Sequence, residues 1–184
     1  MLKLYHTENS ADCEKILFAL DHLGIEYQGI VVPADHQPKT PLLRDGDTDI
    51  SDSTRILEHL AERHDSSLLS TDPLEQGLAS LLEDWADEVL AKIVGASKNA
   101  GDRVPEDLDN ALEKLDLALH DRSYMVGQGL SSADLATYAH LASLPEATRT
   151  AGMEPYVNLR DWYFNISDFR AKSQGRRGSA MFDE

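Results

Sequence analysis

The stretch ENSADCEK, residues 8–15, holds the only cysteine of the chain, and a serine lies three residues before it. Ser-x-x-Cys has the spacing of a redox Cys-x-x-Cys pair in which oxygen replaces the first sulfur. Three interpretations are open. Ser10 is a functional group, Cys13 is one, or the stretch is the start of a helix, where serine is a preferred capping residue. A single cysteine excludes an internal disulfide and a cysteine-rich zinc site.

The elements around this stretch place it at a connection between a strand and a helix. Residues 2–6 alternate apolar and polar side chains and are rich in strand formers, which predicts a strand. Residues 12–23 carry leucines and an isoleucine at helical spacing, and Gly24 is suited to ending that helix. Ser10 and Cys13 therefore belong to the beginning of the first predicted helix.

The next elements continue a mixed pattern up to about residue 66. Residues 25–32 are predicted to form a second strand, and residues 41–50 a hairpin with Asp45-Gly46 in its turn, since glycine tolerates positive φ. A helix is expected from Ser51 or Asp52. The predicted order is strand, helix, strand, hairpin, helix.

Beyond a polar segment at 64–73, nearly the whole chain has helical periodicity. One helix is expected from about Leu74, another from Pro105, and a last one from about Pro155, with a frayed tail after it. The apolar stripe expected to be buried on the first of these comprises Leu78, Leu81, Leu82, Trp85, Val89 and Ile93.

The segment GLSSADLATYAHL, residues 129–141, contains a capping box. Ser131 can cap a helix, and Asp134 can reach back to the Ser131 amide. Leu130 and Leu135 occupy the positions of a hydrophobic staple.

Composition limits the classes of function. The chain has 184 residues, 41% apolar and 27% charged, with a formal net charge of −16. It can bury a core, and its charge repels phosphate backbones and anionic lipids, so neither nucleic acid nor a membrane is an expected partner. The acidity fits an ordinary solvated surface or an adaptation to high salt. Neither a signal peptide nor a long apolar run is found, and we expect a cytoplasmic protein.

Motifs for metal or nucleotide chemistry are not found in the sequence. The seven histidines form no metal set; His59 and His64 are five residues apart, which is the wrong spacing for one helix face. No zinc-protease motif, phosphate loop or nucleotide-binding glycine pattern occurs. We therefore expect no metal.

Three stretches, in this order, resemble the soluble glutathione transferase family: residues 40–60, 124–141 and 157–166. The resemblance implies an α/β plus all-α fold, a thioredoxin-like N-terminal domain followed by an all-helical C-terminal domain of the glutathione transferase type. The expected boundaries are a glutathione-binding domain over 1–65, a linker over 66–76 and the helical domain over 77–184. A homodimer is also implied.

The resemblance assigns part of a glutathione site. Pro41 matches the family's cis-proline, which would present the Thr40 backbone to glutathione as a strand does; the alternative is a trans-proline that opens a strand. Asp52 and Ser53 match the acid–serine pair that holds the γ-glutamyl end. They would cap the following helix in either case.

The catalytic hydroxyl is assigned in the same way. Ser10 matches the position of the catalytic serine and would donate a hydrogen bond to the glutathione thiolate; an N-cap is the alternative. Tyr5, near the position of the hydroxyl in tyrosine-type members, is a second candidate. Cys13 corresponds to a resolving cysteine without a partner. Only residues 33–40 separate Val32 from Pro41, where the family usually has a longer segment that contacts the glycyl end, and Lys39 is the residual cation.

We therefore predict an enzyme that activates the thiol of glutathione, its co-substrate, for conjugation to a small electrophile. Two alternatives stay open at this point. One is a non-catalytic interaction module on the same fold, and the other is a glutathione-dependent thiol-disulfide reductase that uses Cys13.

Overall fold

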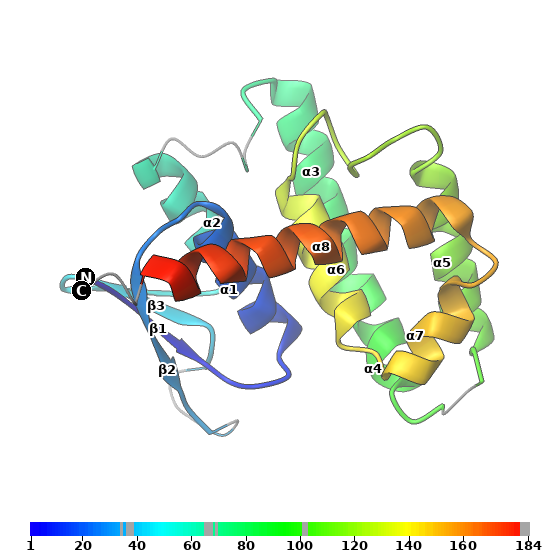
Figure 1. The fold of residues 1–184 in the computed structure, drawn as a ribbon, viewed down its shortest axis with the longest axis horizontal. Helices are drawn as coiled ribbons and strands as arrows, with labels where there is room; N and C mark the ends of the chain where they lie inside the picture. The colour runs from blue at the N-terminus through cyan, green and yellow to red at the C-terminus, as the bar shows by residue number, and fades with distance from the viewer. Residues whose placement is uncertain (34, 36–38, 65–67, 69, 101–102, 181–184) are drawn as a thin grey trace. The chain divides into compact units, whose positions relative to one another are not determined.

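The computed structural model describes the chain except for residues 34, 36–38, 65–67, 69, 101–102 and 181–184, and describes only the backbone of 175–180. The chain forms two compact units, coloured along the sequence in Figure 1. One comprises Met1–Ser66 together with the chain from Asp168 onward, and the other is Ser67–Ser167. The sequence analysis assigned all of 77–184 to the helical domain, whereas these final residues group with the first unit.

The first unit is built on a four-stranded sheet with the order β2-β1-β3-β4. Strand β1 is parallel to β2 and antiparallel to β3, which pairs with β4 as a hairpin. The elements follow the predicted order: β1 (Leu2–His6), α1 (Ala11–His22), β2 (Tyr27–Val31), β3 (Leu42–Asp45), β4 (Thr48–Ser51) and α2 (Ser53–His64).

The alternation of apolar and polar side chains along the strands decides which face of the sheet the helices cover. Leu4 of β1 and Leu43 of β3 are register partners and are fully buried. Helices α1 and α2 pack together over this face (Figure 1). They contribute buried leucine and isoleucine side chains. The neighbouring pair Lys3 and Arg44 lies on the opposite face, since successive side chains of a strand alternate.

The hairpin is confirmed, but its turn is one residue later than predicted. Asp45 is the last residue of β3, and the two loop residues are Gly46 and Asp47. Gly46 has φ of +60°. A two-residue hairpin loop requires positive φ at its first position, which glycine adopts without steric cost.

The second unit is helical. Its elements are α3 (Pro73–Trp85), η1 (Ala86–Leu90), α4 (Ala91–Ser97), α5 (Glu106–Ala118), α6 (Ser132–Ala142), α7 (Glu146–Met153) and the first part of α8 (Val157–Ala180). A membrane-spanning helix needs about 20 mostly apolar residues, and none of the helices in the described ranges meets that requirement.

Three details of the helical unit differ from the prediction. Helix α3 begins at Pro73, capped by Asp72, so its first turn occupies part of the expected linker over 66–76. Helix α7 was not predicted, because its sequence EATRTAGM carries no apolar stripe. The tail expected to fray remains helical to Ala180, and Arg170 and Ser173 within α8 are buried.

Helix α6 is the buried centre of this unit, since every residue from Ser132 to Leu141 is buried. The predicted capping box is confirmed, and both of its hydrogen bonds are present. The Asp134 carboxylate also accepts hydrogen bonds from the Met125 amide and from Trp162 Nε1, each at 2.9 Å. The box therefore ties α6 to α8 as well as capping α6.

The face that α3 buries is not the predicted one. Leu78, Leu81 and Val89 are exposed, with 63% of Leu81 accessible to solvent. The residues buried instead recur at helical spacing along α3, η1 and α4, and two of them are alanines: Ala79, Glu83, Ala86, Leu90 and Val94. Figure 1 shows α3 beside α6. The alanines in this row allow α3 and η1 to approach the buried helix α6 closely. Leu82, Trp85 and Ile93 are half-buried, so about half of the predicted stripe is left as an exposed apolar surface.

Candidate active site

Ser10 occupies the N-cap of α1. Its backbone is extended, with φ −95° and ψ 122°, and its Oγ accepts a hydrogen bond from the Cys13 amide at 3.3 Å. The capping interpretation of ENSADCEK is therefore confirmed. Capping uses a lone pair of the oxygen and leaves the hydroxyl hydrogen available for donation. An N-cap and a thiolate-binding hydroxyl are thus compatible roles.

Cys13 faces the interior of the first unit. Its side chain is 1% exposed, and its Sγ lies 3.8 Å from Oγ1 of Thr7. A reactive thiol must be accessible and ionised. The burial of Cys13 favours a structural role.

Thr7 contacts two of the residues singled out in the sequence, Cys13 and Thr40, and sequence reasoning did not indicate it. It follows β1 directly, and its Oγ1 is hydrogen-bonded to Oγ1 of Thr40 at 3.2 Å, in addition to the contact with Cys13. The hydroxyl thus joins the start of α1 to the segment before β3. A threonine between a strand end and a helix cap was the available signal, but its partner is 33 residues away.

The Thr40–Pro41 peptide bond is cis, as predicted. Pro41 is buried and Thr40 is half-buried, while Lys39 is exposed. Part of the segment 33–40, which the sequence analysis compared with a longer one in the family, lies outside the described residues.

Asp52 caps α2. Its Oδ1 accepts hydrogen bonds from the Thr54 and Arg55 amides at 3.1 and 3.2 Å, and Asp52 has φ of +82°. Within the described part of the chain, Asp52 Oδ2 has no hydrogen-bond partner. Ser53, the first residue of α2, is buried. Of the predicted pair Asp52 and Ser53, it is Asp52 that caps α2.

Tyr5 interacts with a cation on the sheet. Its hydroxyl accepts a hydrogen bond from Nη1 of Arg44 at 3.3 Å, and the guanidinium carbon lies 5.4 Å from the ring centroid. Arg44 also binds Asp49 through two nitrogens, at 2.6 and 2.7 Å, and this hydrogen bonding lowers the pKa of the Asp49 carboxyl. The contact orients Tyr5 and Arg44 together; the catalytic role of Tyr5 stays a prediction.

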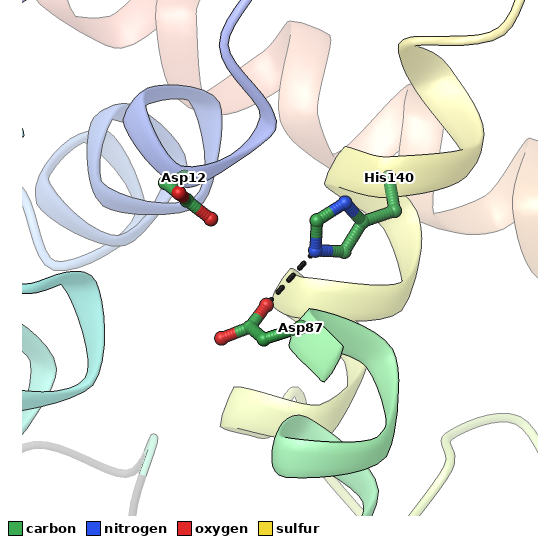
Figure 2. A group of neighbouring side chains, drawn as sticks. All are labelled: Asp12, Asp87 and His140. Carbon is green, nitrogen blue, oxygen red and sulfur yellow. Dashed lines mark hydrogen bonds and ion pairs between the residues drawn. The ribbon is translucent and has the colours of Figure 1, made fainter. Parts of the chain in front are cut away.

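The helical unit contains a separate polar pair that the sequence did not indicate. Nε2 of His140 on α6 lies 2.9 Å from Oδ1 of Asp87, and Figure 2 shows the two side chains pointing toward one another. Asp87 belongs to η1, a π-helical turn. The His140 side chain is buried, and the pair joins η1 to α6.

The two units define a class of protein. A four-stranded mixed sheet with a β1-α1-β2 crossover and a cis-proline before β3 is thioredoxin-like, and here it is combined with an all-helical unit. This combination is the glutathione transferase fold. A family model described as the glutathione S-transferase N-terminal domain matches residues 4–68, and one described as the C-terminal domain matches residues 80–168. The chain belongs to the soluble glutathione transferase family.

Individual relatives are similar over nearly the whole chain. Glutathione S-transferase 4 of Zea mays is 24% identical over 199 residues, which cover 90% of this chain and 87% of the maize protein. Poplar glutathione transferase F1 has a TM-score of 0.79 at 17% identity and matches 97% of this chain and 98% of its own. A glutathione transferase of Methylobacillus flagellatus, solved with glutathione bound, has a TM-score of 0.78 at 21% identity, over 94% and 98% of the two chains. The two structures support the fold.

Proposed function

We propose that this protein binds glutathione on its sheet unit and uses Ser10 to stabilise the glutathione thiolate, which then attacks a small electrophile. The observation that carries the proposal is the geometry of Ser10. Its oxygen caps α1, and its hydroxyl hydrogen is left to donate to an anionic sulfur. A hydrogen bond to the charged form of an acid lowers its pKa.

Three other segments of the same unit supply the binding groups. The backbone of Thr40, before the cis-proline Pro41, would pair with the extended tripeptide. Asp52 Oδ2 would accept from the α-ammonium group of glutathione, and Ser53 would bind the neighbouring carboxylate. Lys39, which is exposed, would meet the glycyl carboxylate. The bound glutathione in the Methylobacillus flagellatus relative supports this choice of ligand.

The reaction keeps a simple balance of atoms and electrons. The glutathione thiol gives its proton to solvent, and the sulfur lone pair forms a bond to the electrophilic carbon. A leaving group departs with its electron pair or, in an addition, the product takes up a proton. Ser10 is not attacked; it donates a hydrogen bond to the sulfur before the carbon–sulfur bond forms.

A pH profile of conjugation tests the role of Ser10. A hydrogen bond to a charged group is worth about 1.5–3 kcal/mol. Ser10→Ala should therefore raise the thiol pKa in the complex by about one to two units and slow conjugation near neutral pH about tenfold or more. The assay is conjugation of a chromogenic electrophile, together with calorimetric titration of glutathione.

Two control variants separate the alternatives. Tyr5→Phe and Cys13→Ser should change the pH profile little. Loss of turnover in Cys13→Ser but not in Ser10→Ala would favour a thiol-disulfide reductase. A parent protein that neither binds millimolar glutathione nor conjugates at any pH would be an interaction module on this fold.

A homodimer in the cytoplasm completes the proposal. The exposed stripe on α3 and η1, formed by Leu74, Leu78, Leu81 and Val89, is the kind of apolar surface that a second subunit covers. The cytoplasm keeps thiols reduced, which suits both a glutathione-dependent reaction and an unpaired Cys13.

A further inference from the structure

Arg170, just past the middle of α8, is held inside the first unit by residues of α1. Its side chain is 6% exposed. Nε donates to Glu14 Oε1 at 2.7 Å, and Nη1 donates to Asp21 Oδ2 at 2.6 Å. The guanidinium carbon also lies 5.3 Å from the centroid of the Phe18 ring. One side chain of the C-terminal helix therefore contacts α1 at three points.

The three contacts form one face of α1. Glu14, Phe18 and Asp21 are separated by four and three residues, so they lie above one another on the helix. Ser10 precedes Glu14 by four residues and continues the same row. The Glu14 amide donates to the Ser10 carbonyl oxygen at 2.9 Å, which is the first hydrogen bond of the helix. The ion pair between Arg170 and Glu14 therefore lies about one helical turn from Ser10.

The far end of the row is anchored as well. The Asp21 side chain is 4% exposed and also accepts from the Tyr27 hydroxyl of β2 at 3.2 Å. A buried carboxylate that loses its cation is strongly unfavourable. Asp21 therefore fixes the position of the Arg170 guanidinium next to β2. Because the same rigid, planar group also binds Glu14, the position of Glu14 at the start of α1 is fixed as well. Lysine could not hold both carboxylates in this way, because its ammonium group lacks the rigid fork.

We propose that Arg170 is a positioning residue, which fixes the first turn of α1 and so aims the Ser10 hydroxyl at the sulfur of bound glutathione. The part that concerns glutathione rests on the function proposed above. The part that concerns the first turn of α1 does not.

Hydrogen exchange of the full-length protein tests whether Arg170 fixes the first turn of α1. In Arg170→Lys, the amides of Cys13 and Glu14 should exchange about tenfold faster or more, the factor expected when a hydrogen bond to a charged group is lost. Glu14→Gln weakens the same contact from the other side, because it removes the carboxylate charge and leaves the Arg170–Asp21 pair in place, so it should shift the exchange of the same amides. Arg160→Lys is the matched control on the same helix, and it should leave them unchanged. Equal exchange in the parent, Arg170→Lys and Glu14→Gln would overturn the proposal.

A double-mutant cycle tests the route through Ser10. Arg170→Lys should raise the pKa of the bound glutathione thiol by about half a unit to one unit, three- to tenfold less thiolate below that pKa. In a Ser10→Ala background the same substitution should have no further effect on the thiol pKa. An equal rise in both backgrounds would overturn the proposal, because Arg170 would then act independently of Ser10.

The two failures are distinguishable. If the parent does not lower the thiol pKa and Ser10→Ala changes nothing, the proposed function is wrong. The exchange of the Cys13 and Glu14 amides still decides in that case whether Arg170 positions the start of α1.

Discussion

Asp134→Ala removes the acceptor of a buried group of hydrogen bonds. Oδ1 accepts from the Met125 amide and Trp162 Nε1, and Oδ2 accepts from the amide and hydroxyl of Ser131. Asp134 itself is fully buried. Alanine leaves three N–H donors without this acceptor, because only the Ser131 hydroxyl can rotate to another role.

The cost follows from the number of donors. An unsatisfied buried donor costs about 1–3 kcal/mol, so three of them predict a loss of about 3–9 kcal/mol. A domain is stabilised by about 5–15 kcal/mol in total, so even the lower value is a large fraction. Asp134→Asn keeps Oδ1 for Met125 and Trp162 and turns an amide group toward the Ser131 donor, so it should cost about a third as much.

Urea denaturation followed by circular dichroism measures these differences, with the slope of each transition checked against the parent. Asp161→Ala is the control, since that carboxylate is exposed and 3.9 Å from Nε of Arg160. A surface substitution of this kind should stay within about 0.5 kcal/mol. The reasoning is refuted if Asp134→Ala costs less than about 1 kcal/mol, or less than Asp134→Asn, because another group must then satisfy the donors.

Three further outcomes are expected. The net charge of −16 predicts that the melting temperature rises from low salt to molar potassium chloride, because screening weakens the repulsion between acidic groups beyond about 10 Å at 0.1 M salt. A melting temperature that does not change with salt would show that the charges are balanced locally. Partial burial and the hydrogen bond to Asp109 raise the pKa of Tyr156 from 10 to about 12, so the folded protein holds this proton more tightly. The contribution of Tyr156 to the free energy of unfolding should therefore be fully present below pH 10 and be lost as the pH rises toward 12. Urea denaturation of Tyr156→Phe at several pH values should not show this loss. Leu81→Lys on the exposed stripe should convert a dimer to a monomer in sedimentation experiments, whereas a monomeric parent would contradict the proposed homodimer.

Features encoded by neighbouring residues were predicted well. The cap at Ser10, the hairpin glycine Gly46 and the capping box of Asp134 each depend on positions within about one turn of structure. The cis form of the Thr40–Pro41 bond followed from the family resemblance of its surroundings, and the structure has it.

Features that depend on distant partners were not predicted. Thr7 is linked to the predicted site residue Thr40 by a hydrogen bond across 33 positions, and the buried state of Arg170 depends on Glu14 and Asp21. An isolated threonine or arginine gives no periodic signal.

The buried face of α3 was predicted wrongly for a related reason. Hydrophobic periodicity identifies an apolar stripe, but it cannot tell whether that stripe or the row containing Ala79 and Ala86 meets α6. Close packing against a fully buried helix favoured the small residues. Leu78 and Leu81, which stood out in the sequence, were left on the surface.

The grouping of the last part of α8 with the sheet has a consequence for synthesis on the ribosome. Arg170 lies 149 residues after Asp21 in the chain. At about 5–20 residues per second, α1 is translated about 7–30 seconds before Arg170. During that interval Glu14 and Asp21 have no Arg170 to neutralise them, and the face of α1 that they share with Phe18 lacks its contacts with that side chain. The amino-terminal unit, although translated first, is therefore completed last, and a nascent chain that stalls before residue 170 should be a substrate for chaperones or proteases.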